Sequence, residues 1–476
     1  MINKHQVNIN MGFFTKKNKE GATKAMAPPQ PTIAETIEPI SQTNEVTHND
    51  KATPAPSKRS IGSLFMGDRV IWVVYFFLCV ISLVEVYSAA STLAYKSGRF
   101  WDPLVKQALF LAMGTVVVIC IHRVPCRMFK AFPILFWPLS ILLLGITLLG
   151  GNSTNDAARW ISLGFVQFQP SELAKGTVII AEALILSRMQ RKDGADRRAI
   201  KLILTITFAT LLLIVSENLS TAALLFGVVF IMMFIGRVPL VQLGKLLGGI
   251  TIIGVMMSVL VYFSDDMPVL HRFETWKERI ERHFGSDESQ QEETPATYDI
   301  DKGAQVAHAN IAIASSNGIG RMPGNSVQRD FLSQAFSDFI FAVIIEEMGI
   351  WGATIVVFLY IILLFRAGRI ASRCERNFPA FLIMGLTLLL VSQAMLNMMV
   401  AVGLFPVTGQ TLPLISRGGT STIINCIYIG MILSVSRYAK QTEHPVHTQF
   451  DGPMTDIMHT EEQRKPRKKK LATADQ

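Results

Sequence analysis

Long apolar runs alternate with short polar connectors along most of this chain. A helix needs roughly 20 predominantly apolar residues to cross the hydrocarbon core of a bilayer. Runs of about that length recur, and they predict about ten transmembrane helices at 70–90, 104–121, 131–149, 172–187, 201–215, 219–236, 244–263, 339–365, 379–402 and 420–436. The predicted fold class is therefore an all-α, polytopic membrane protein. A tight re-entrant turn is an alternative around residues 216–220, where only five residues separate two runs.

Polar segments flank this apolar region on both sides. Residues 1–68 are rich in Pro, Ser, Thr and charge and have no periodic apolar positions, so we expect a disordered tail. Residues 441–476 are similarly polar and basic, which leaves 69–440 as the transmembrane domain. Because no apolar run precedes residue 70, we expect the first span to act as a signal anchor rather than as part of a cleaved signal peptide.

The basic residues predict how the chain is oriented in the membrane. Lys and Arg gather in alternate connectors, namely HRVPCRMFK, SRMQRKDGADRRAIK, GRVPLVQLGK and RAGRIASRCER. The positive-inside rule places these connectors, and both termini, in the cytoplasm. The opposite side then carries 150–171, a loop at about 265–338, and 403–419. In the long loop, HRFETWKERIERHF has the pattern of an amphipathic helix and GSDESQQEETPATYDID that of a flexible segment.

Composition narrows the class of protein further. Half of the 476 residues are hydrophobic and 17% are charged, which is typical of a membrane protein. The formal charge of +9 follows the connectors and tails, so it indicates topology and no nucleic-acid partner. The five cysteines lie in apolar runs or basic connectors and imply no disulfide framework. Metal-ligand spacing, a Walker motif and a G-x-S-x-G elbow are all absent from the sequence, so neither an ATPase nor a serine hydrolase is supported.

Three acidic residues stand out near the eighth run. Ionisable residues in membrane spans indicate functional sites by default. The run SDFIFAVIIEEMGIWGA places Asp338 at the mouth of the span, with Glu346 and Glu347 about two turns deeper. Glu346 falls within about 80° of Asp338 on a helical wheel and Glu347 nearly opposite, so Glu346 is the better candidate to share a cavity. Structural roles are open alternatives, as an N-cap for Asp338 and as ion-pair partners for the glutamates.

Two further segments combine charge with irregular composition. In ARWISLGFVQFQPSELAK, Arg159 is placed to grip an anionic head group. Glu172 and Lys175 are three residues apart on one helix face, where they either neutralise each other or contact substrate. The segment GLFPVTGQTLPLISRGGTS, 403–421, has too much Gly and Pro to be helical throughout. It is either a connector or, as its length favours, the wall of a cavity.

Taken together, these segments resemble the SEDS family of cell-wall polymerases, which includes the division protein FtsW, the elongation protein RodA and sporulation relatives. The resemblance rests on RWISLGFVQFQPSELAK, GNSVQRDFLSQAFSDFIFAVIIEEMGIWG and GLFPVTGQTLPLISRGGTS, and it extends from about 69 to 440. It implies ten transmembrane helices and an enzyme, a peptidoglycan glycosyltransferase that polymerises lipid II into glycan strands on the outer face of the cytoplasmic membrane.

The resemblance also implies a set of site residues. Asp338 matches the family's catalytic aspartate, and we expect it to act as the general base. The expected substrate-binding residues are Arg159, Glu172, Lys175, Gln305, Glu346 and Arg417. Gln305, in DKGAQVAHA, resembles the glutamine that begins the family's loop motif. No cofactor is required by the sequence, although a divalent cation, Mg²⁺ or Mn²⁺, would suit a pyrophosphate leaving group.

Three departures from the family's usual residues alter the surroundings of this site. Where members commonly read Leu-Pro-Glu-Ala-His-Thr before the aspartate, this chain has LSQAFS at 332–337, so Ser333, Gln334 and Phe336 replace Pro, Glu and His. SENLSTA stands where Gln-Pro-Asp-Leu-Gly-Thr-Ala is usual. Arg417 stands where a tyrosine is usual. Asp338 is therefore the single candidate for the catalytic residue. The three departures also change the polarity of the cavity expected around it.

Several functions are compatible with this sequence. A lipid II flippase or transporter is the main alternative to a polymerase, because charged groups inside a helical membrane body also suit a carrier. A scaffold that recruits a transpeptidase is a third. The expected partners are lipid II, a class B penicillin-binding transpeptidase, other divisome proteins and the membrane. The long N-terminal tail and SENLSTA favour an FtsW-like member at the division septum over a RodA-like elongation polymerase.

Overall fold

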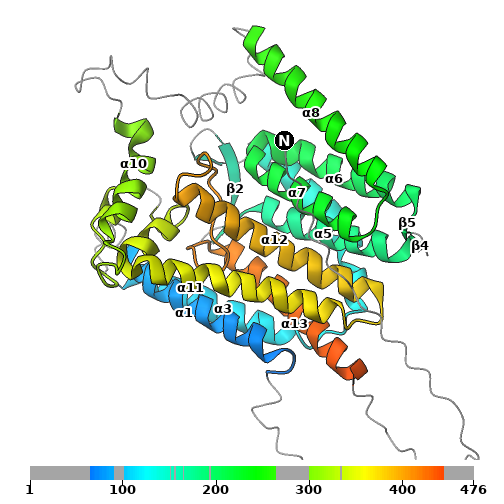
Figure 1. Ribbon diagram of the computed structural model, residues 1–476, viewed down its shortest axis with the longest axis horizontal. Helices are drawn as coiled ribbons and strands as arrows, with labels where there is room; N and C mark the ends of the chain where they lie inside the picture. The colour runs from blue at the N-terminus through cyan, green and yellow to red at the C-terminus, as the bar shows by residue number, and fades with distance from the viewer. Residues whose placement is uncertain are drawn as a thin grey trace, which may run out of the picture. The chain divides into compact units, whose positions relative to one another are not determined.

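Helices occupy all ten of the predicted apolar runs. The computed structural model describes residues 65–89, 101–150, 152–154, 157–163, 166–191, 194–263, 300–332 and 335–443. The helices over the apolar runs are α1 (Arg69–Ala89), α3 (Asp102–Ile121), α4 (Phe132–Gly150), α5 (Pro170–Arg188), α6 (Arg197–Glu217), α7 (Leu219–Ile235), α8 (Leu240–Phe263), α11 (Ile340–Ala371), α12 (Asn377–Ala401) and α13 (Thr420–Glu443). The prediction of a polytopic helical membrane protein is confirmed (Figure 1).

The connectors contain shorter elements that the sequence did not predict. Residues after α4 form an antiparallel sheet of strands β1 (Asn152–Thr154), β2 (Ala157–Leu163) and β3 (Val166–Phe168). A two-stranded ribbon, β4 (Gln190–Arg191) and β5 (Gly194–Ala195), joins α5 to α6. Helix α10 (Ile300–Ser315) and the 3₁₀ turns η2 (Met128–Lys130) and η4 (Gln328–Asp330) complete the described elements. The predicted amphipathic helix HRFETWKERIERHF and most of both tails lie outside the described residues.

Within the described residues, seven helices are long and apolar enough to cross a membrane. Helix α7 and the apolar part of α8 are apolar but shorter, at 17 residues or fewer. Helix α5 is absent from both groups, because Glu172, Lys175, Glu182 and Arg188 lower its hydropathy. The count of ten crossings therefore stays a prediction. Between α6 and α7 the turn is very tight, since only Asn218 separates them and its Oδ1 accepts from the N–H groups of Ser220 and Thr221.

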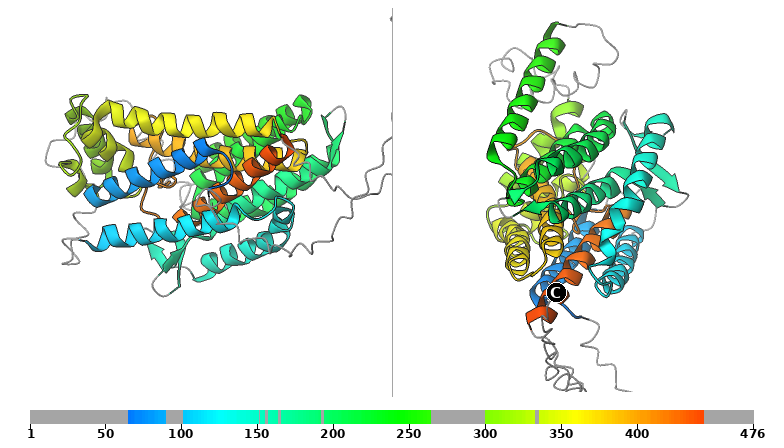
Figure 2. Two further views of the ribbon diagram at one scale, coloured as in Figure 1. Left: turned by 90° about the horizontal axis from the view of Figure 1, so that it is seen from below. Right: turned by 90° about the vertical axis from the view of Figure 1, so that its right-hand side faces the viewer.

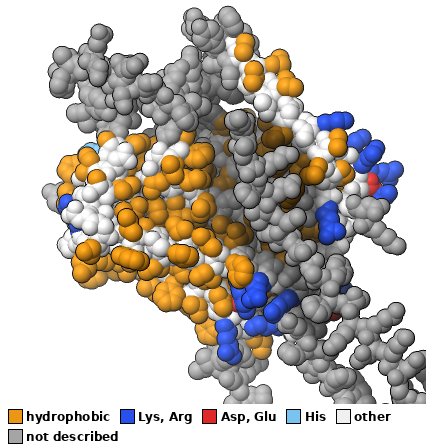
Figure 3. Space-filling view, viewed as in Figure 1, with side chains coloured by type: hydrophobic (Ala, Val, Ile, Leu, Met, Phe, Trp, Pro, Cys, Tyr) orange, Lys and Arg blue, Asp and Glu red, His pale blue; other side chains and the backbone are white. Residues whose placement is uncertain are grey.

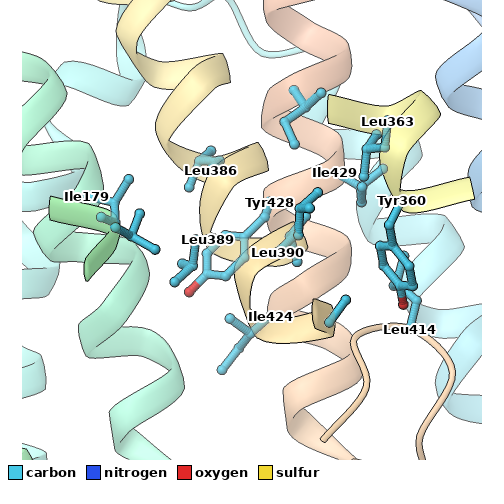
Figure 4. Close-up of a cluster of buried hydrophobic side chains, with 14 of the residues drawn as sticks. Ile179, Tyr360, Leu363, Leu386, Leu389, Leu390, Leu414, Ile424, Tyr428 and Ile429 are labelled. Carbon is cyan, nitrogen blue, oxygen red and sulfur yellow. The ribbon is translucent and has the colours of Figure 1, made fainter. Parts of the chain in front are cut away.

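Helix α12 lies at the centre of the bundle and packs against α5, α7, α11 and α13. Its sequence is apolar on all sides, which is the pattern of a buried helix. Leu386, Leu389 and Leu390 of α12 lie between Ile179 of α5 and the α13 side chains (Figure 4). Because α12 contacts α5 and α7 as well as α11 and α13, polar groups on it can reach several connectors at once.

The surface of the bundle is largely apolar (Figure 3). Helix α8 stands away from the other helices in both Figure 1 and Figure 2, and its contact with the bundle is through α7. Its exposed residues include Val241 (70% exposed), Ile252 (62%) and Met256 (67%). Apolar area of this extent is characteristic of a lipid-facing surface. Lys and Arg side chains gather at the lower and right-hand margins of the face in Figure 3.

The start of α1 is held by an aspartate that the sequence had assigned to the disordered tail. Asp68 is buried, and its Oδ1 accepts from the N–H groups of Val70 (2.9 Å) and Ile71 (3.3 Å). Its Oδ2 lies 2.7 Å from Nη2 of Arg366 on α11. Burial alone would raise the pKa of this carboxyl, but the hydrogen bond and charge of Arg366 and the two backbone N–H groups lower it. Asp68 therefore joins the first span to the eighth.

We expect replacement of Asp68 by Ala to lower the free energy of unfolding by roughly 2 to 4 kcal/mol, because an N-cap is lost and Arg366 is left without its carboxylate. Thermal unfolding in detergent would show this as a lower Tm. Because the pKa of Asp68 is lowered in the fold, its contribution is present above the carboxyl's usual pKa of 3.8 and is lost as the pH falls below it. The control is Glu375→Gln, because Glu375 is an exposed acid in the connector between α11 and α12. Equal Tm values for all three proteins would contradict the assignment.

Candidate active site

Asp338 lies in the turn that precedes α11 and is half-buried. Ser337 Oγ donates a 2.8 Å hydrogen bond to its Oδ1. The N-cap position of α11 belongs to Phe339, and no side chain caps it. The alternative that Asp338 is merely an N-cap is therefore wrong.

The backbone around Asp338 is held by α12 and by the α12–α13 loop (residues 402–419). Asn397 of α12 donates from Nδ2 to the carbonyl oxygens of both Asp338 (2.9 Å) and Gln410 (2.6 Å). Ser416 Oγ donates to the carbonyl of Ser337 at 2.6 Å. Two of the three segments singled out in the sequence thus meet at Asp338, and a single buried asparagine joins them.

Arg417 of the α12–α13 loop lies beside the same turn. Its backbone N–H donates to the carbonyl of Phe336 at 3.0 Å, and its guanidinium carbon lies 5.4 Å from the centre of the Phe336 ring. Burial lowers the pKa of this guanidinium below its usual value, although Arg stays cationic at neutral pH. The structure therefore brings a positive charge to the residues directly before Asp338.

The predicted ion pair between Glu172 and Lys175 is present. Lys175 Nζ lies 2.8 Å from Glu172 Oε1, and both side chains are buried. The same Nζ donates to Gln393 Oε1 of α12 at 2.8 Å, and Gln393 Nε2 donates to the carbonyl of Thr411 at 3.1 Å. The pair is thus connected through Gln393 to the loop that contacts Asp338. All three segments meet around α12.

A glycine on α5 brings α13 close to this ion pair. Tyr428 of α13 donates a 2.6 Å hydrogen bond to the carbonyl of Glu172. A Cβ atom at Gly176 would lie 2.2 Å from the Tyr428 hydroxyl oxygen, so only glycine permits this approach. The close contact fixes the first turn of α5, which carries both charges.

Glu346 and Glu347 hold a segment of the long loop that we call the strap (residues 318–329). Glu346 accepts from Ser326 Oγ (2.5 Å) and from the N–H of Val327 (3.0 Å). Glu347 accepts from Ser88 Oγ of α1 and from the N–H groups of Gly324 (3.0 Å) and Ser326 (3.1 Å). Both glutamates therefore bind the same segment. The helical wheel singled out Glu346 as the glutamate on the side of Asp338, but the strap contacts both glutamates.

A break in α11 makes this arrangement possible. Gly349 has φ = 66°, which interrupts the helix and leaves the carbonyls of Glu346 and Glu347 free of helical partners. Those carbonyls accept from the N–H groups of Arg321 (2.9 Å) and Met322 (2.8 Å) of the strap. The strap is therefore fixed to α11 by backbone as well as side-chain hydrogen bonds. These bonds lie about two helical turns along the chain from Asp338.

Two predicted site residues are only partly placed. Arg159 lies in β2, and its side chain is outside the described residues. Gln305 lies in α10, which packs against α11, and it is half-buried. The sheet that carries Arg159 reaches the site through Thr420, whose Oγ1 donates to the carbonyl of Gln167 in β3 at 2.7 Å.

No cluster of three or more His, Cys, Asp or Glu that could hold a metal ion occurs among the residues placed by the structure. Ser337 Oγ donates to the carboxylate of Asp338, and Asn397 donates to its backbone carbonyl. A Mg²⁺ ion is usually held by one or two carboxylates together with substrate phosphates. The donor set around Asp338 fits an ion that arrives with a phosphorylated substrate.

Comparison with known proteins places this arrangement in a family. The family model FTSW_RODA_SPOVE, described as "Cell cycle protein", matches residues 68–441. The chain belongs to this family. A relative named "Probable peptidoglycan glycosyltransferase FtsW" from Nitrosomonas europaea is 31% identical over 369 residues, which cover 75% of this chain and 89% of the relative. "Peptidoglycan glycosyltransferase MrdB" of Escherichia coli is 27% identical, over 83% of this chain and all of that protein.

A solved structure gives the same fold. It is described as "Structural coordination of polymerization and crosslinking by a peptidoglycan synthase complex". Its matching chain is 26% identical to this one, with a TM-score of 0.62, over 79% of this chain and 99% of that chain. In this family member the residues that organise the site include two that the sequence reasoning missed, Gln393 and Asn397. The signal for them was their polar character at i, i+4 within an otherwise apolar helix.

The coupling of Glu172 and Lys175 can be measured by a double-mutant cycle. We expect Lys175→Met to lower the unfolding free energy by roughly 3 to 5 kcal/mol, because it leaves a buried carboxylate unpaired. Glu172→Gln should also lower it, and the double variant should recover part of the loss, with an interaction of roughly 1 to 3 kcal/mol. Thermal or denaturant unfolding in detergent measures each value. Strictly additive losses would show that the two charges do not interact.

Proposed function

We propose that this chain is a peptidoglycan glycosyltransferase that polymerises lipid II into glycan strands at the outer face of the cytoplasmic membrane. The observation that carries the proposal is the position of Asp338: half-buried at the mouth of α11, with its backbone held by Asn397 against the α12–α13 loop. A carboxylate held by a rigid scaffold suits a reacting group better than a transport pathway. The names of the relatives support the same activity.

In this reaction the 4-hydroxyl of the acceptor sugar attacks the anomeric carbon of the donor, and the lipid pyrophosphate leaves. Asp338 takes the hydroxyl proton as general base. Arg417, next to the turn that contains Asp338, and Arg159 in β2 compensate the charge on the pyrophosphate. Glu346 acts by holding the strap beside α11, so we assign it a positioning role rather than contact with the sugar.

A divalent cation, Mg²⁺ or Mn²⁺, would supply further charge compensation at the pyrophosphate, with Asp338 as its protein ligand. The buried ion pair of Glu172 and Lys175 carries no net charge, so its part in substrate binding is through shape and through Gln393. We therefore assign charge compensation to Arg417, which lies beside the turn that contains Asp338, and to Arg159.

The setting of this activity is part of the same proposal. The FtsW name of several relatives favours synthesis at the division septum, with both termini in the cytoplasm. The similarity to a peptidoglycan synthase complex favours a class B penicillin-binding transpeptidase as partner, with other divisome proteins around it. Depletion in the host tests this setting, because filamentous cells indicate a division role and spherical cells indicate an elongation role.

Asp338→Asn should lower the rate of glycan synthesis by roughly 10² to 10⁴-fold, since a general base is lost while the size of the side chain is kept. The assay uses the purified full chain, with and without its transpeptidase, and labelled lipid II. Asp330→Asn is the control, because Asp330 is an exposed aspartate of the same loop. If the Asp338 variant made glycan strands at the wild-type rate, Asp338 would not be the general base. If the protein moved lipid II across vesicle membranes without forming polymer, a transporter would be favoured.

Asn397→Ala should lower kcat by roughly tenfold to a hundredfold while the KM for lipid II changes little, because the turn with Asp338 loses its anchor but the binding groups remain. Asn377→Ala, at the exposed start of the same helix, should leave both values unchanged. A variant that binds lipid II poorly and turns it over normally would show that Asn397 does not position Asp338.

A further inference from the structure

A basic pocket lies at the far end of α11 from Asp338. Its walls come from the α3–α4 connector (122–131), the start of α12 and the end of α13. The space inside it is about 590 Å³, its open mouth included. Helix α11 has 32 residues, which at 1.5 Å each span roughly 48 Å. The pocket is therefore separate from the candidate active site.

Four cationic side chains from different elements line this pocket. Arg127 and Lys130 come from the α3–α4 connector, Arg376 precedes α12, and Arg437 lies on α13. Two of them are held in place: Lys130 Nζ lies 5.5 Å from the ring centre of the buried Phe378, and Arg437 Nη2 donates to the carbonyl of Arg123 at 3.2 Å. Their positions are thus fixed in part before any ligand arrives.

Acidic side chains are absent from the described lining of this pocket. Within the described ranges none of the four cations forms an ion pair. Other arginines in the basic connectors and helix ends do have partners, since Arg191 pairs with Asp196 (2.6 Å) and Arg366 with Asp68 (2.7 Å). Four like charges around one hollow repel each other, so a bound anion would be stabilised there.

The positive-inside rule explains the sign of these residues, because connectors on the cytoplasmic side are generally basic. It does not explain why four cations from three separate segments converge on one concave pocket with an aromatic lining. The pocket also lies where four apolar helices end, which is the level of lipid head groups. Ile134 (70% exposed) and Leu135 (66%), one turn along from Lys130, offer an apolar surface beside it.

We propose that this pocket binds a phosphate-bearing anion, with the head group of an anionic phospholipid as the source that its position favours. Arginine guanidinium groups match phosphate oxygens in geometry and charge, and basic pockets between membrane helices recognise anionic head groups. The acyl chains of such a lipid would lie along the apolar surface of α4. The site is independent of the glycosyltransferase proposal, because it stands on residues remote from Asp338.

The test measures lipid retention by the full chain, purified in neutral detergent. Native mass spectrometry compares phosphatidylglycerol and cardiolipin with phosphatidylethanolamine, and calorimetry measures inorganic phosphate as the soluble probe. The pocket variant combines Arg127→Gln with Arg437→Gln. The control variant combines Arg197→Gln with Arg198→Gln, which removes the same charge from exposed positions on the same predicted side. A third protein, with Arg127→Lys and Arg437→Lys, keeps the charge and checks that the fold survives.

We expect the pocket variant to bind the anionic lipids about thirtyfold more weakly, from roughly fivefold for each cation lost at a membrane surface. The control variant should lose less than about twofold, and the lysine variant should stay within about fivefold of wild type. Binding of inorganic phosphate with no preference for anionic lipid would support the pocket and identify a soluble phosphate as its ligand. Equal losses in the pocket and control variants, or no binding of any phosphate by the wild type, would overturn the proposal.

Discussion

The irregular backbone between α12 and α13 is largely buried, so its polar groups must find hydrogen-bond partners within the protein. Much of the site follows from this constraint. Gln393 and Asn397 of α12 satisfy the carbonyls of Thr411 and Gln410, and Gln410 itself donates to Thr221 of α7 at 2.5 Å. Each polar side chain that satisfies the loop also connects it to another helix. The loop thus connects α5, α7, α11 and α12 and fixes their positions relative to one another.

The buried charges follow the same logic on both sides of α12. Lys175 is neutralised by Glu172 and oriented by Gln393, so it adds no net charge to the bundle. Glu346 and Glu347 are instead satisfied mainly by N–H groups of the strap, and Arg329 of the strap lies 4.0 Å from Glu347 Oε1. A carboxylate satisfied by backbone groups fixes a loop in place. We therefore assign Glu346 and Glu347 the role of fixing the strap to α11 rather than of contacting substrate.

Much of this fold could be predicted from the sequence, because the membrane imposes a length and hydropathy on each helix that shows directly in the chain. The pair of Glu172 and Lys175 was also accessible, since i, i+3 spacing needs only helix geometry. Contacts between distant segments were not accessible. The helical wheel placed Glu347 opposite Asp338, but it contained neither the strap nor the break at Gly349. Gln393 and Asn397 could not be selected by charge, because both are neutral amides in an apolar helix, yet a buried amide also joins helices.

The way in which Asp338 is held also explains how its upstream neighbours can differ from those usual in the family. The turn is fixed by main-chain carbonyls: Asp338 to Asn397, Ser337 to Ser416 and Phe336 to the Arg417 N–H. Side chains at these positions can therefore change without moving the aspartate. Moreover, two of the unusual residues contact each other, because the Arg417 guanidinium lies over the Phe336 ring. A histidine facing an arginine would bring two cationic groups together when protonated, so phenylalanine at 336 and arginine at 417 suit each other in a way that either substitution alone would not.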